Sequence, residues 1–471
     1  MKKILSLLLL LSTLVSFFTA CGTVASQPPA AATVTSGDAS DDFSAIPPIK
    51  EEELMESAEL GTYVAGRAFD VANRDNGAGS VLSIAKNTNK EEFLGYVAEL
   101  EAKGFAKYTG NKIGNNLFVT LVTKTQIVNL SYFENTKEVY ASVDSRSTFS
   151  LPGLKTENLY QAKSDPDQSF TMLAMGQNTY DTGLGFIYKL ADGSFFIIDG
   201  GIDSDGNKSD DDPQNHLKWV KATLRELADD PDNIVVSTWL ITHIHNDHVG
   251  LFKDMAQDEE ARSTITVERV IYNQPSDAEM TAGGIAHRID WMADSIEAWN
   301  IRTVVKAHPG QVFYIKDLTL TIYATHEIVD TQYLSDHNNA CIVSTVGFKH
   351  KTALMLADSS EYENLKIAEI YKDDLYAICD ILQLAHHGYG DGSNGKHTRP
   401  DPVYQLVEPE IVLWSNGSNR LHANGNIFGQ EFNQKFFAPG IDNHVAGEQN
   451  TTFKDLSSWE NPDRWVPEGW E

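Results

Sequence analysis

The chain has 471 residues, of which 41% are hydrophobic and 22% charged, an ordinary balance for a soluble globular protein. Because this length exceeds what one domain usually needs, two folded units are expected. The formal net charge is −29, from 37 basic and 66 acidic residues, and no run of the sequence is rich in Lys and Arg. Such a surface repels phosphate backbones, which argues against dedicated nucleic-acid binding. A metal-dependent nuclease stays compatible, since bound ions carry positive charge to their site.

The first 21 residues have the pattern of a secretory signal peptide, with a basic start, an apolar run over 4–18 and a small residue before a cysteine. This ending resembles a bacterial lipoprotein cleavage site. It predicts that Cys21 becomes the lipidated first residue of a cell-surface protein outside the cytoplasm, anchored to the membrane. Phe18 departs from the usual pattern, so cleavage after Ala20 to give a fully secreted protein is the alternative. The apolar run is shorter than a transmembrane helix requires.

Two further segments precede the part of the chain that carries chemistry. Residues 22–50 are rich in Ala, Ser, Thr, Pro and Asp, which predicts a flexible tether. Residues 51–153 predict a small α+β domain, in which Thr88 and Glu91 fit a capping box and Gly104 ends the helix. Three β-rich runs follow, at 117–122, 127–133 and 139–143. No catalytic motif occurs there, so a substrate-binding or dimerising unit and a structural spacer both remain open.

The stretch ITHIHNDHVG at residues 241–250 concentrates groups that bind metals. It follows an apolar, β-branched run over 234–240 that predicts a buried strand. Histidines two apart on an extended backbone point to the same side, so His243 and His245 can bind one ion. Asp247 and His248 follow as the chain turns, and can bind a second ion beside the first. A polar loop with coincidental histidines is the alternative, but four such groups within six residues favour a metal site.

His-x-His-x-Asp-His after a strand resembles the signature of the metallo-β-lactamase superfamily. Three other segments match motifs of this superfamily in the expected order. Residues 193–201 have Asp199 before two glycines, residues 353–358 end in Asp358, and residues 381–388 contain His386-His387-Gly388. The double histidine resembles the branch that contains competence-type DNA-uptake domains and bacterial phosphorylcholine esterase. The resemblance covers residues 168–440. It implies an α/β fold, a four-layer αββα sandwich over residues 165–450 that follows the small α+β domain.

The resemblance also implies a centre with two divalent ions. His243 and His245 would bind the first ion, Asp247 and His248 the second, and Asp358 would bridge them. Two ions joined by Asp358 and a water convert that water to hydroxide near neutral pH. Zinc suits these ligands, with iron or manganese as alternatives.

The last pair of histidines has two implied roles. One of His386 and His387 would complete the second ion's shell, and the other would face the substrate as proton donor or oxyanion stabiliser. The sequence does not distinguish them, so both stand with Asp247 as catalytic candidates. Asp199 would hold the metal loop through hydrogen bonds.

Many family members supply one more histidine to the first ion. Here the candidates are His287, His308, His326 and His337. The double-histidine branch often has asparagines near that point, as in Asn338-Asn339. We therefore expect the first ion to have fewer protein ligands and to exchange more easily.

Three other features carry predictions. Met280, His287, Trp291, Met292 and Trp299 either border the active-site mouth or pack a helix, and their spacing favours packing. Cys341 and Cys379 lie in apolar runs and are expected to be buried free thiols. Residues 451–471, with Trp459, Trp465 and Trp470, form a tail too short for a domain.

The expected function is hydrolysis of a phosphoester, with a phosphodiester favoured, on a small-molecule or cell-surface substrate. Attack on an amide, lactam or thioester carbonyl is one alternative, and a binding protein with a degenerate metal site is another. A redox role requires iron with a flavin or similar partner, and no flavin-domain sequence is present. The oligomeric state is not indicated.

Overall fold

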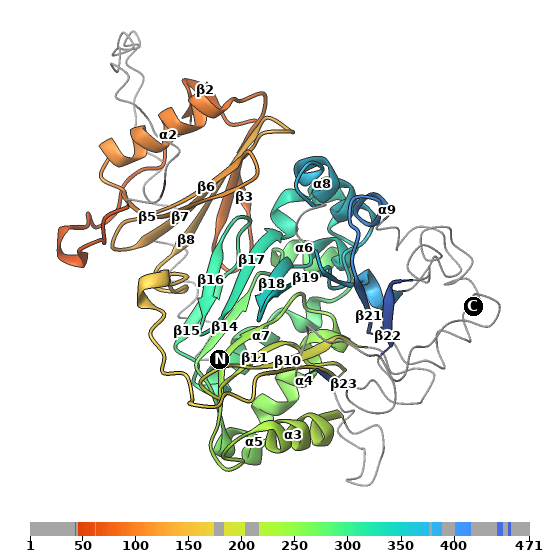
Figure 1. Cartoon of the computed structure of the whole chain (residues 1–471). Coiled ribbons are helices and arrows are strands. Elements are labelled where there is room, and N and C mark those ends of the chain that lie inside the picture. The colour runs from red at the N-terminus through yellow and green to blue at the C-terminus, as the bar shows by residue number, and fades with distance from the viewer. Residues whose placement is uncertain are drawn as a thin grey trace. The chain divides into compact units, whose positions relative to one another are not determined.

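The computed structural model describes residues 43, 46–61, 63–173, 183–202, 216–375, 379–388, 401–415, 440–445 and 451–453 (Figure 1). The signal peptide predicted at 1–21, most of the 22–50 tether and the three tail tryptophans lie outside these ranges. Within the described part, no helix is long and apolar enough to span a bilayer.

The first folded element is an antiparallel six-stranded sheet, here called the N-terminal sheet, with strand order β3-β4-β8-β7-β6-β5. Helix α2 (Lys90–Ala102) covers one face through a core that includes Phe93, Val97 and Leu100. The strands are β3 (Val71–Asp75), β4 (Val81–Ala85), β5 (Ala106–Ile113), β6 (Asn116–Val122), β7 (Gln126–Phe133) and β8 (Glu138–Ser145). Before them lie η1 (Glu51–Glu53) and a small ribbon of β1 (Tyr63–Val64) and β2 (Arg67–Ala68).

The predicted capping box at Thr88 and Glu91 is wrong by one residue. Asn89 caps α2 and exchanges hydrogen bonds with Glu92, because the Thr88 side chain is engaged elsewhere. Its hydroxyl donates to the Lys137 carbonyl at 3.0 Å, in the turn between β7 and β8. A tertiary hydrogen bond thus occupies the Thr88 side chain, and Asn89 caps the helix instead.

The sandwich begins with a mixed sheet of order β15-β14-β12-β11-β10-β9-β23, with β13 beside β12. Strands β11, β12, β14 and β15 run parallel to one another, so their carboxyl ends meet at one edge. The members are β9 (Ser169–Met172), β10 (Gly185–Lys189), β11 (Phe195–Asp199), β12 (Ile234–Leu240), β13 (Ile265–Val267), β14 (Arg269–Tyr272), β15 (Thr303–Lys306) and β23 (Thr451–Phe453). Strand β23 pairs with β9, which returns the end of the described chain to the start of this sheet.

The second sheet has the order β16-β17-β18-β19-β20-β21-β22. Its last four strands are parallel, so β19, β20 and β21 also end at one edge. The members are β16 (Val312–Ile315), β17 (Leu318–Ala324), β18 (Val343–Phe348), β19 (Lys351–Met355), β20 (Ile381–Gln383), β21 (Ile411–Trp414) and β22 (Asp442–Val445).

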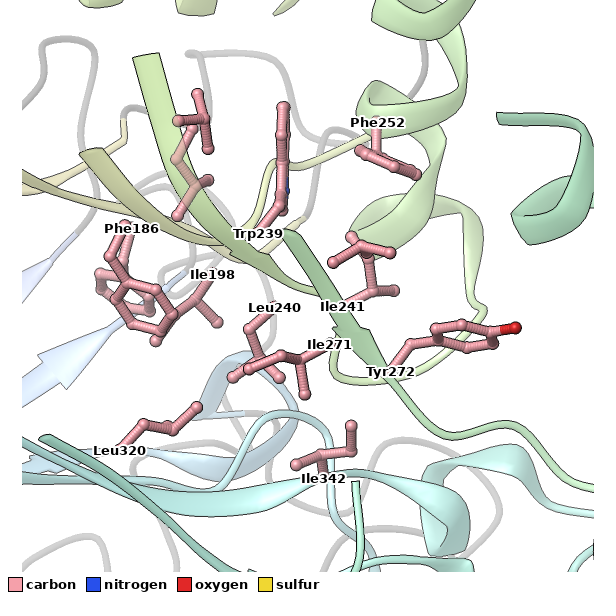
Figure 2. Packing of buried hydrophobic residues seen from close by; sticks show 14 of the residues in the cluster. Phe186, Ile198, Trp239, Leu240, Ile241, Phe252, Ile271, Tyr272, Leu320 and Ile342 are labelled. Atoms are coloured by element: carbon pink, nitrogen blue, oxygen red, sulfur yellow. The ribbon is translucent and has the colours of Figure 1, made fainter. Parts of the chain in front are cut away.

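Apolar side chains of the two sheets meet in a shared core. Phe186, Ile198 and Leu240 of the first sheet lie across from Leu320 and Ile342 (Figure 2). Each such buried side chain contributes roughly 1.5–3 kcal/mol. The core holds the two sheets together and thereby brings their carboxyl edges near each other.

Helices cover the outer faces of the sandwich. On the first sheet, α4 (Asn246–Gln257) packs against β11 and against three helices, α3 (His216–Leu227), α5 (Glu259–Thr264) and α7 (Trp291–Trp299). On the second sheet, α8 (Glu361–Tyr371) packs against β17 and against α9 (Asp401–Tyr404). Between β14 and β15 the chain also forms α6 (Asp277–Ala282) and η3 (Ala286–Arg288). The layers are therefore helix, sheet, sheet, helix, and the predicted four-layer αββα fold is confirmed.

Two predictions about buried side chains have clear outcomes. Met280, Met292 and Trp299 are buried, so these members of the 276–300 segment serve packing. Cys341 and Cys379 are buried free thiols, as predicted.

Candidate metal centre

The predicted site residues all follow strands at the carboxyl edges of the two sheets. Asp199 ends β11, the histidine motif follows β12, and Asp358 follows β19. Beyond β20, His386 and His387 lie in η8 (Ala385–Gly388). Because the parallel strands of each sheet end at the same edge, side chains from distant parts of the sequence converge.

The backbone is strained around this convergence. Positive φ angles occur at Asp199 (50°), Ala357 (50°), His386 (48°) and His387 (59°), none of which is glycine. Each left-handed residue costs on the order of 1 kcal/mol, and such strain is concentrated at functional sites. These four strained residues lie where the chain leaves a strand and turns toward the convergence of site residues.

The first group of ligand atoms comes from His243, His245 and Asp358, and these atoms lie within 4.8 Å of one another. The two imidazole centroids are 4.7 Å apart. The extended backbone after β12 projects both rings to one side, as the spacing predicts.

The second group contains Asp247, His248, Asp358 and His387, again within 4.8 Å of one another. His248 Nε2 lies 3.1 Å and His387 Nε2 3.2 Å from Asp358 Oδ2, and His387 Nε2 lies 3.3 Å from Asp247 Oδ2. Asp247 and His248 project from the first turn of α4, which begins at Asn246. Asp358 belongs to both groups and is the shared member.

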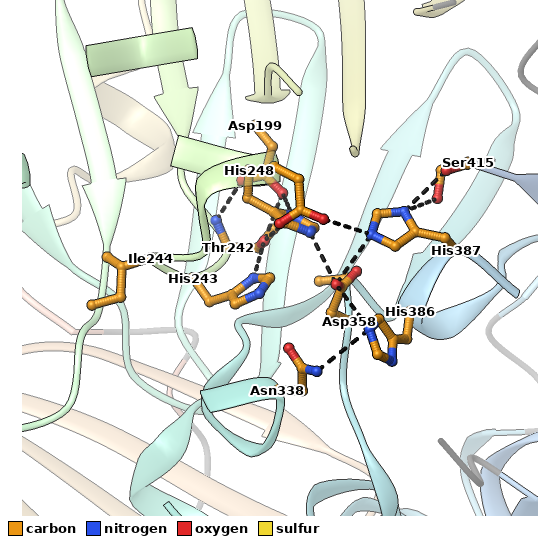
Figure 3. A network of polar contacts seen from close by, with 12 residues as sticks. Asp199, Thr242, His243, Ile244, His248, Asn338, Asp358, His386, His387 and Ser415 are labelled. Atoms are coloured by element: carbon orange, nitrogen blue, oxygen red, sulfur yellow. Dashed lines mark hydrogen bonds and ion pairs between the residues drawn. The ribbon is translucent and has the colours of Figure 1, made fainter. Parts of the chain in front are cut away.

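Hydrogen bonds behind the site orient its histidines (Figure 3). Asp199 Oδ2 lies 2.7 Å from His248 Nδ1, and Asp199 Oδ1 accepts the Thr242 amide at 2.7 Å. His387 Nδ1 lies 3.0 Å from the Ser415 carbonyl, to which it donates. Both partners direct the Nε2 atoms of the rings to the centre, the usual way in which ligand imidazoles are held.

Burial and charge divide the histidines into two electrostatic classes. Burial holds the pKa of His243 well below its usual range and lowers the pKa of His245 to about 4. At neutral pH these two rings are therefore neutral and able to bind a metal.

The other two rings face carboxylates. Burial opposes protonation of His248, but Asp358 and Asp199 outweigh it and raise its pKa well above the usual value. Burial likewise opposes protonation of His387, while Asp358 and Asp247 raise its pKa to about 9. The buried carboxylates at this centre are thus stabilised by positive charge, which either protons or metal ions can supply.

The residues present fit two divalent ions. Among the described residues, no hydrogen-bond partner exists for the buried atoms His243 Nε2 and Asp358 Oδ1. Such orphaned atoms are costly unless a ligand satisfies them. A set of imidazoles and carboxylates is one that zinc, iron and manganese accept.

His386 lies at the margin of the centre. Its Nε2 is 3.8 Å from Asp358 Oδ2 and 3.5 Å from Asn338 Nδ2, and its side chain is 23% exposed. It belongs to neither ligand group, whereas His387 does. The geometry therefore places His387 within the converging atoms and His386 beside them.

The four candidates for an additional histidine ligand lie in different environments. His337, in η6 (His337–Ala340), has its ring centroid 6.1 Å from that of His245. His287 is exposed and lies 5.9 Å from the Trp291 ring. His308 and His326 are buried in contacts with Glu327 and Asn76, away from both ligand groups. Of the four, only His337 adjoins the first ligand group.

A basic cluster beside the motif was not evident in the sequence. Arg288 Nη1 donates to the Ile244 carbonyl at 3.2 Å, and its guanidinium lies 5.3 Å from the Trp291 ring centre. Lys253 Nζ lies 4.3 Å from the same ring. The two cations are 35 positions apart in the sequence. Lys253 lies in α4 and Arg288 in η3, so the packing of α4 against α7 brings both to the ring of Trp291. Trp291 therefore combines packing with a place beside the metal loop.

Comparison with known proteins yields similarity in structure only. No protein-family model matches the chain, and no curated protein sequence matches it. Among solved structures, CmlA, a diiron β-hydroxylase from Streptomyces venezuelae, is 13% identical, with 62% of this chain and 55% of that chain covered and a TM-score of 0.35. The match thus spans about half the length of CmlA.

Two other solved structures are similar to part of this chain. The metallo-β-lactamase fold protein YhfI from Bacillus subtilis is 10% identical over 61% of this chain and 100% of that chain, with a TM-score of 0.35. A metallo-β-lactamase from Cronobacter sakazakii is 17% identical over 50% of this chain and 88% of that chain, with a TM-score of 0.28. These similarities concern the fold, and function has to be argued from the site.

Proposed function

We propose that the protein is a metal-dependent hydrolase that binds two divalent ions and cleaves phosphoesters, with phosphodiesters preferred. One observation carries the proposal: two groups of ligand atoms, each confined within 4.8 Å, share Asp358. When bound, two divalent ions supply Lewis acidity and activate water for attack at neutral pH. His243 and His245 would hold one ion, and Asp247, His248 and His387 the other.

The chain's own side chains have distinct tasks in this proposal. Asp199 and the Ser415 carbonyl fix the His248 and His387 rings, so the ligands need little rearrangement. Burial lowers the pKa of His386, which keeps its imidazole neutral at pH 7. A neutral imidazole at the margin of the site can donate an N–H to the oxygen that gains charge as the leaving group departs.

The cations beside the motif support an anionic substrate. The charge of Arg288 reaches His245, whose pKa it helps to lower, so the guanidinium acts on the centre itself. Lys253, which also lies 3.4 Å from Asp254 Oδ1, brings a second cation to the Trp291 ring in a chain of net charge −29. Local positive potential concentrates anions, and a phosphodiester carries one negative charge.

The test is a substrate panel. Purified protein lacking residues 1–21, loaded with zinc, is assayed against chromogenic phosphodiesters, phosphomonoesters, a lactam and a thioester. The proposal expects diester cleavage that chelator abolishes and added zinc restores. Hydrolysis of the lactam or thioester without any phosphoester cleavage contradicts it, and favours attack on a carbonyl instead.

We further propose that the enzyme works outside the cytoplasm, tethered by lipid at Cys21. The lipoprotein-type leader supports this. A small-molecule or cell-surface substrate suits such a location.

A further inference from the structure

Four charged side chains are buried together between the N-terminal sheet and the sandwich. Asp144 belongs to β8, Lys306 to β15, Glu327 to η4 (His326–Ile328), and His308 follows β15. Their exposed fractions are 3%, 3%, 3% and 1%. Buried charges at this depth are rare and need compensation by partners.

His308 connects the two carboxylates. Its Nε2 lies 2.7 Å from Asp144 Oδ2, and its Nδ1 lies 2.9 Å from Glu327 Oε1. An imidazole that faces a carboxylate at each nitrogen must donate from both, so it is the imidazolium. Together with Lys306 the cluster has two positive and two negative charges, which makes it electrically balanced.

The N-terminal sheet holds Glu327 and its neighbours through further hydrogen bonds. Asn76, in the turn from β3 to β4, donates from Nδ2 to Glu327 Oε1 at 2.5 Å and accepts from His326 Nε2 at 3.1 Å. Ser142 of β8 donates to Glu327 at 3.1 Å, and Arg74 of β3 donates to the Val329 carbonyl at 3.2 Å. Residues 326–329 are thus fixed from one side by this sheet.

The same segment leads directly to the metal centre. Through η5 (Thr331–Tyr333) it reaches η6, which contacts η4 and carries His337 and Asn338. Asn338 lies 3.5 Å from His386, and the following Ile342 amide donates to the Thr242 carbonyl at 2.8 Å. Residues 325–342, here called the clamped segment, therefore connect the buried charges to the metal loop.

We infer that the N-terminal sheet is a positioning element for the metal centre, and that Asn76 and Glu327 are the positioning residues that hold the clamped segment. This gives residues 51–153 a task that the sequence left open between a substrate-binding unit and a spacer. The inference rests on the proposed metal centre but not on the identity of the substrate. Neither residue touches the ligand groups, so both act only through the segment that ends beside His386 and Thr242.

The test compares Asn76→Ala with Asn111→Ala in the full chain. Asn111 is a matched control, because this β5 asparagine donates to the Gly310 carbonyl of the sandwich at 3.1 Å but does not contact the clamped segment. Hydrogen exchange of the Asn339 and Ile342 amides is measured without metal. Asn76→Ala should accelerate their exchange about tenfold relative to parent, the effect expected when a buried hydrogen bond to a charged group is lost. Asn111→Ala should leave it unchanged.

Activity supplies a second readout. With a cleavable diester, Asn76→Ala should lower kcat about tenfold with little change in KM, because the side chains near His386 lose their position while substrate binding is retained. Equal exchange at Asn339 and Ile342 in the two variants overturns the inference. If no substrate is cleaved at all, the exchange comparison still decides, so failure of the proposed function is separable. If Asn76→Ala does not fold, Ser142→Ala, which removes one hydrogen bond to Glu327, is used in its place.

Discussion

The buried His308 predicts a loss of stability at alkaline pH. Burial opposes its charge, but Glu327 and Asp144 outweigh burial and raise its pKa from 6.5 to about 9. The folded state therefore holds this proton more tightly than the unfolded chain does. Its contribution is complete below pH 6.5 and is lost as pH rises through 9. A difference of this size corresponds to about 3 kcal/mol.

The two carboxylate partners of His308 do not titrate in this pH window. Burial opposes ionisation of Asp144 and Glu327, yet His308 outweighs it and holds both pKa values below their usual range. Their contribution is present above pH 5 and is lost only in acid. Burial also lowers the pKa of Lys306, which Asp144 and Glu327 oppose.

The assay is urea unfolding at pH 6.5 and 9.5, on the parent and a His308→Gln/Glu327→Gln double variant. The double variant removes one charge of each sign and leaves Asp144 opposite Lys306, so it avoids an uncompensated buried charge. Groups common to both proteins cancel in the comparison. The parent should lose about 3 kcal/mol more than the double variant between the two pH values. Parallel losses in the two proteins refute the reasoning.

Four further outcomes are expected. Elemental analysis should find about two equivalents of zinc in the parent and a clear loss in Asp358→Ala, because both ligand groups share this carboxylate; an unchanged content contradicts a shared ligand. His386→Gln should keep its metal and lose about 10²–10³ in kcat, whereas His387→Gln should lose metal from one site, and the reverse pattern would exchange their roles. Asp199→Asn should weaken zinc affinity roughly 10–100-fold in a chelator competition, since His248 loses the partner that orients it. In a bacterial host, labelled palmitate should be incorporated into the full chain and not into Cys21→Ser; no label in the parent points to ordinary secretion.

Local sequence patterns were sufficient where one stretch supplies the geometry. His243 and His245 are two apart on extended backbone, so their shared direction follows from strand geometry alone. Asp199, Asp358 and His387 were found through the resemblance of three strand-end segments to the metallo-β-lactamase superfamily, and parallel strands bring such ends together. Strands β6, β7 and β8 were predicted because β-branched and aromatic residues recur in them between polar turn residues.

Other elements gave no adequate local signal. Strands β3, β4 and β5 were missed, and β3 and β5 lie at the edges of the N-terminal sheet with most side chains only partly buried. Edge strands carry polar residues on exposed positions, so their periodicity is weak. The helix cap shifted from Thr88 to Asn89 because Thr88 bonds a strand turn that lies 49 positions later in the chain.

From the sequence by itself, spacing after one strand indicated the metal motif, while the resemblance of four segments to a known superfamily predicted the fold class and the other candidate site residues. Only the tertiary structure decided where His386 and His387 lie relative to Asp358, the placement of His308 among buried carboxylates, and the approach of Arg288 and Lys253 to the Trp291 ring. The physical reason is the distance along the chain over which each kind of interaction acts. Strand periodicity acts over a few residues, whereas the charge, burial and hydrogen bonding of a side chain depend on groups that packing brings from distant parts of the chain.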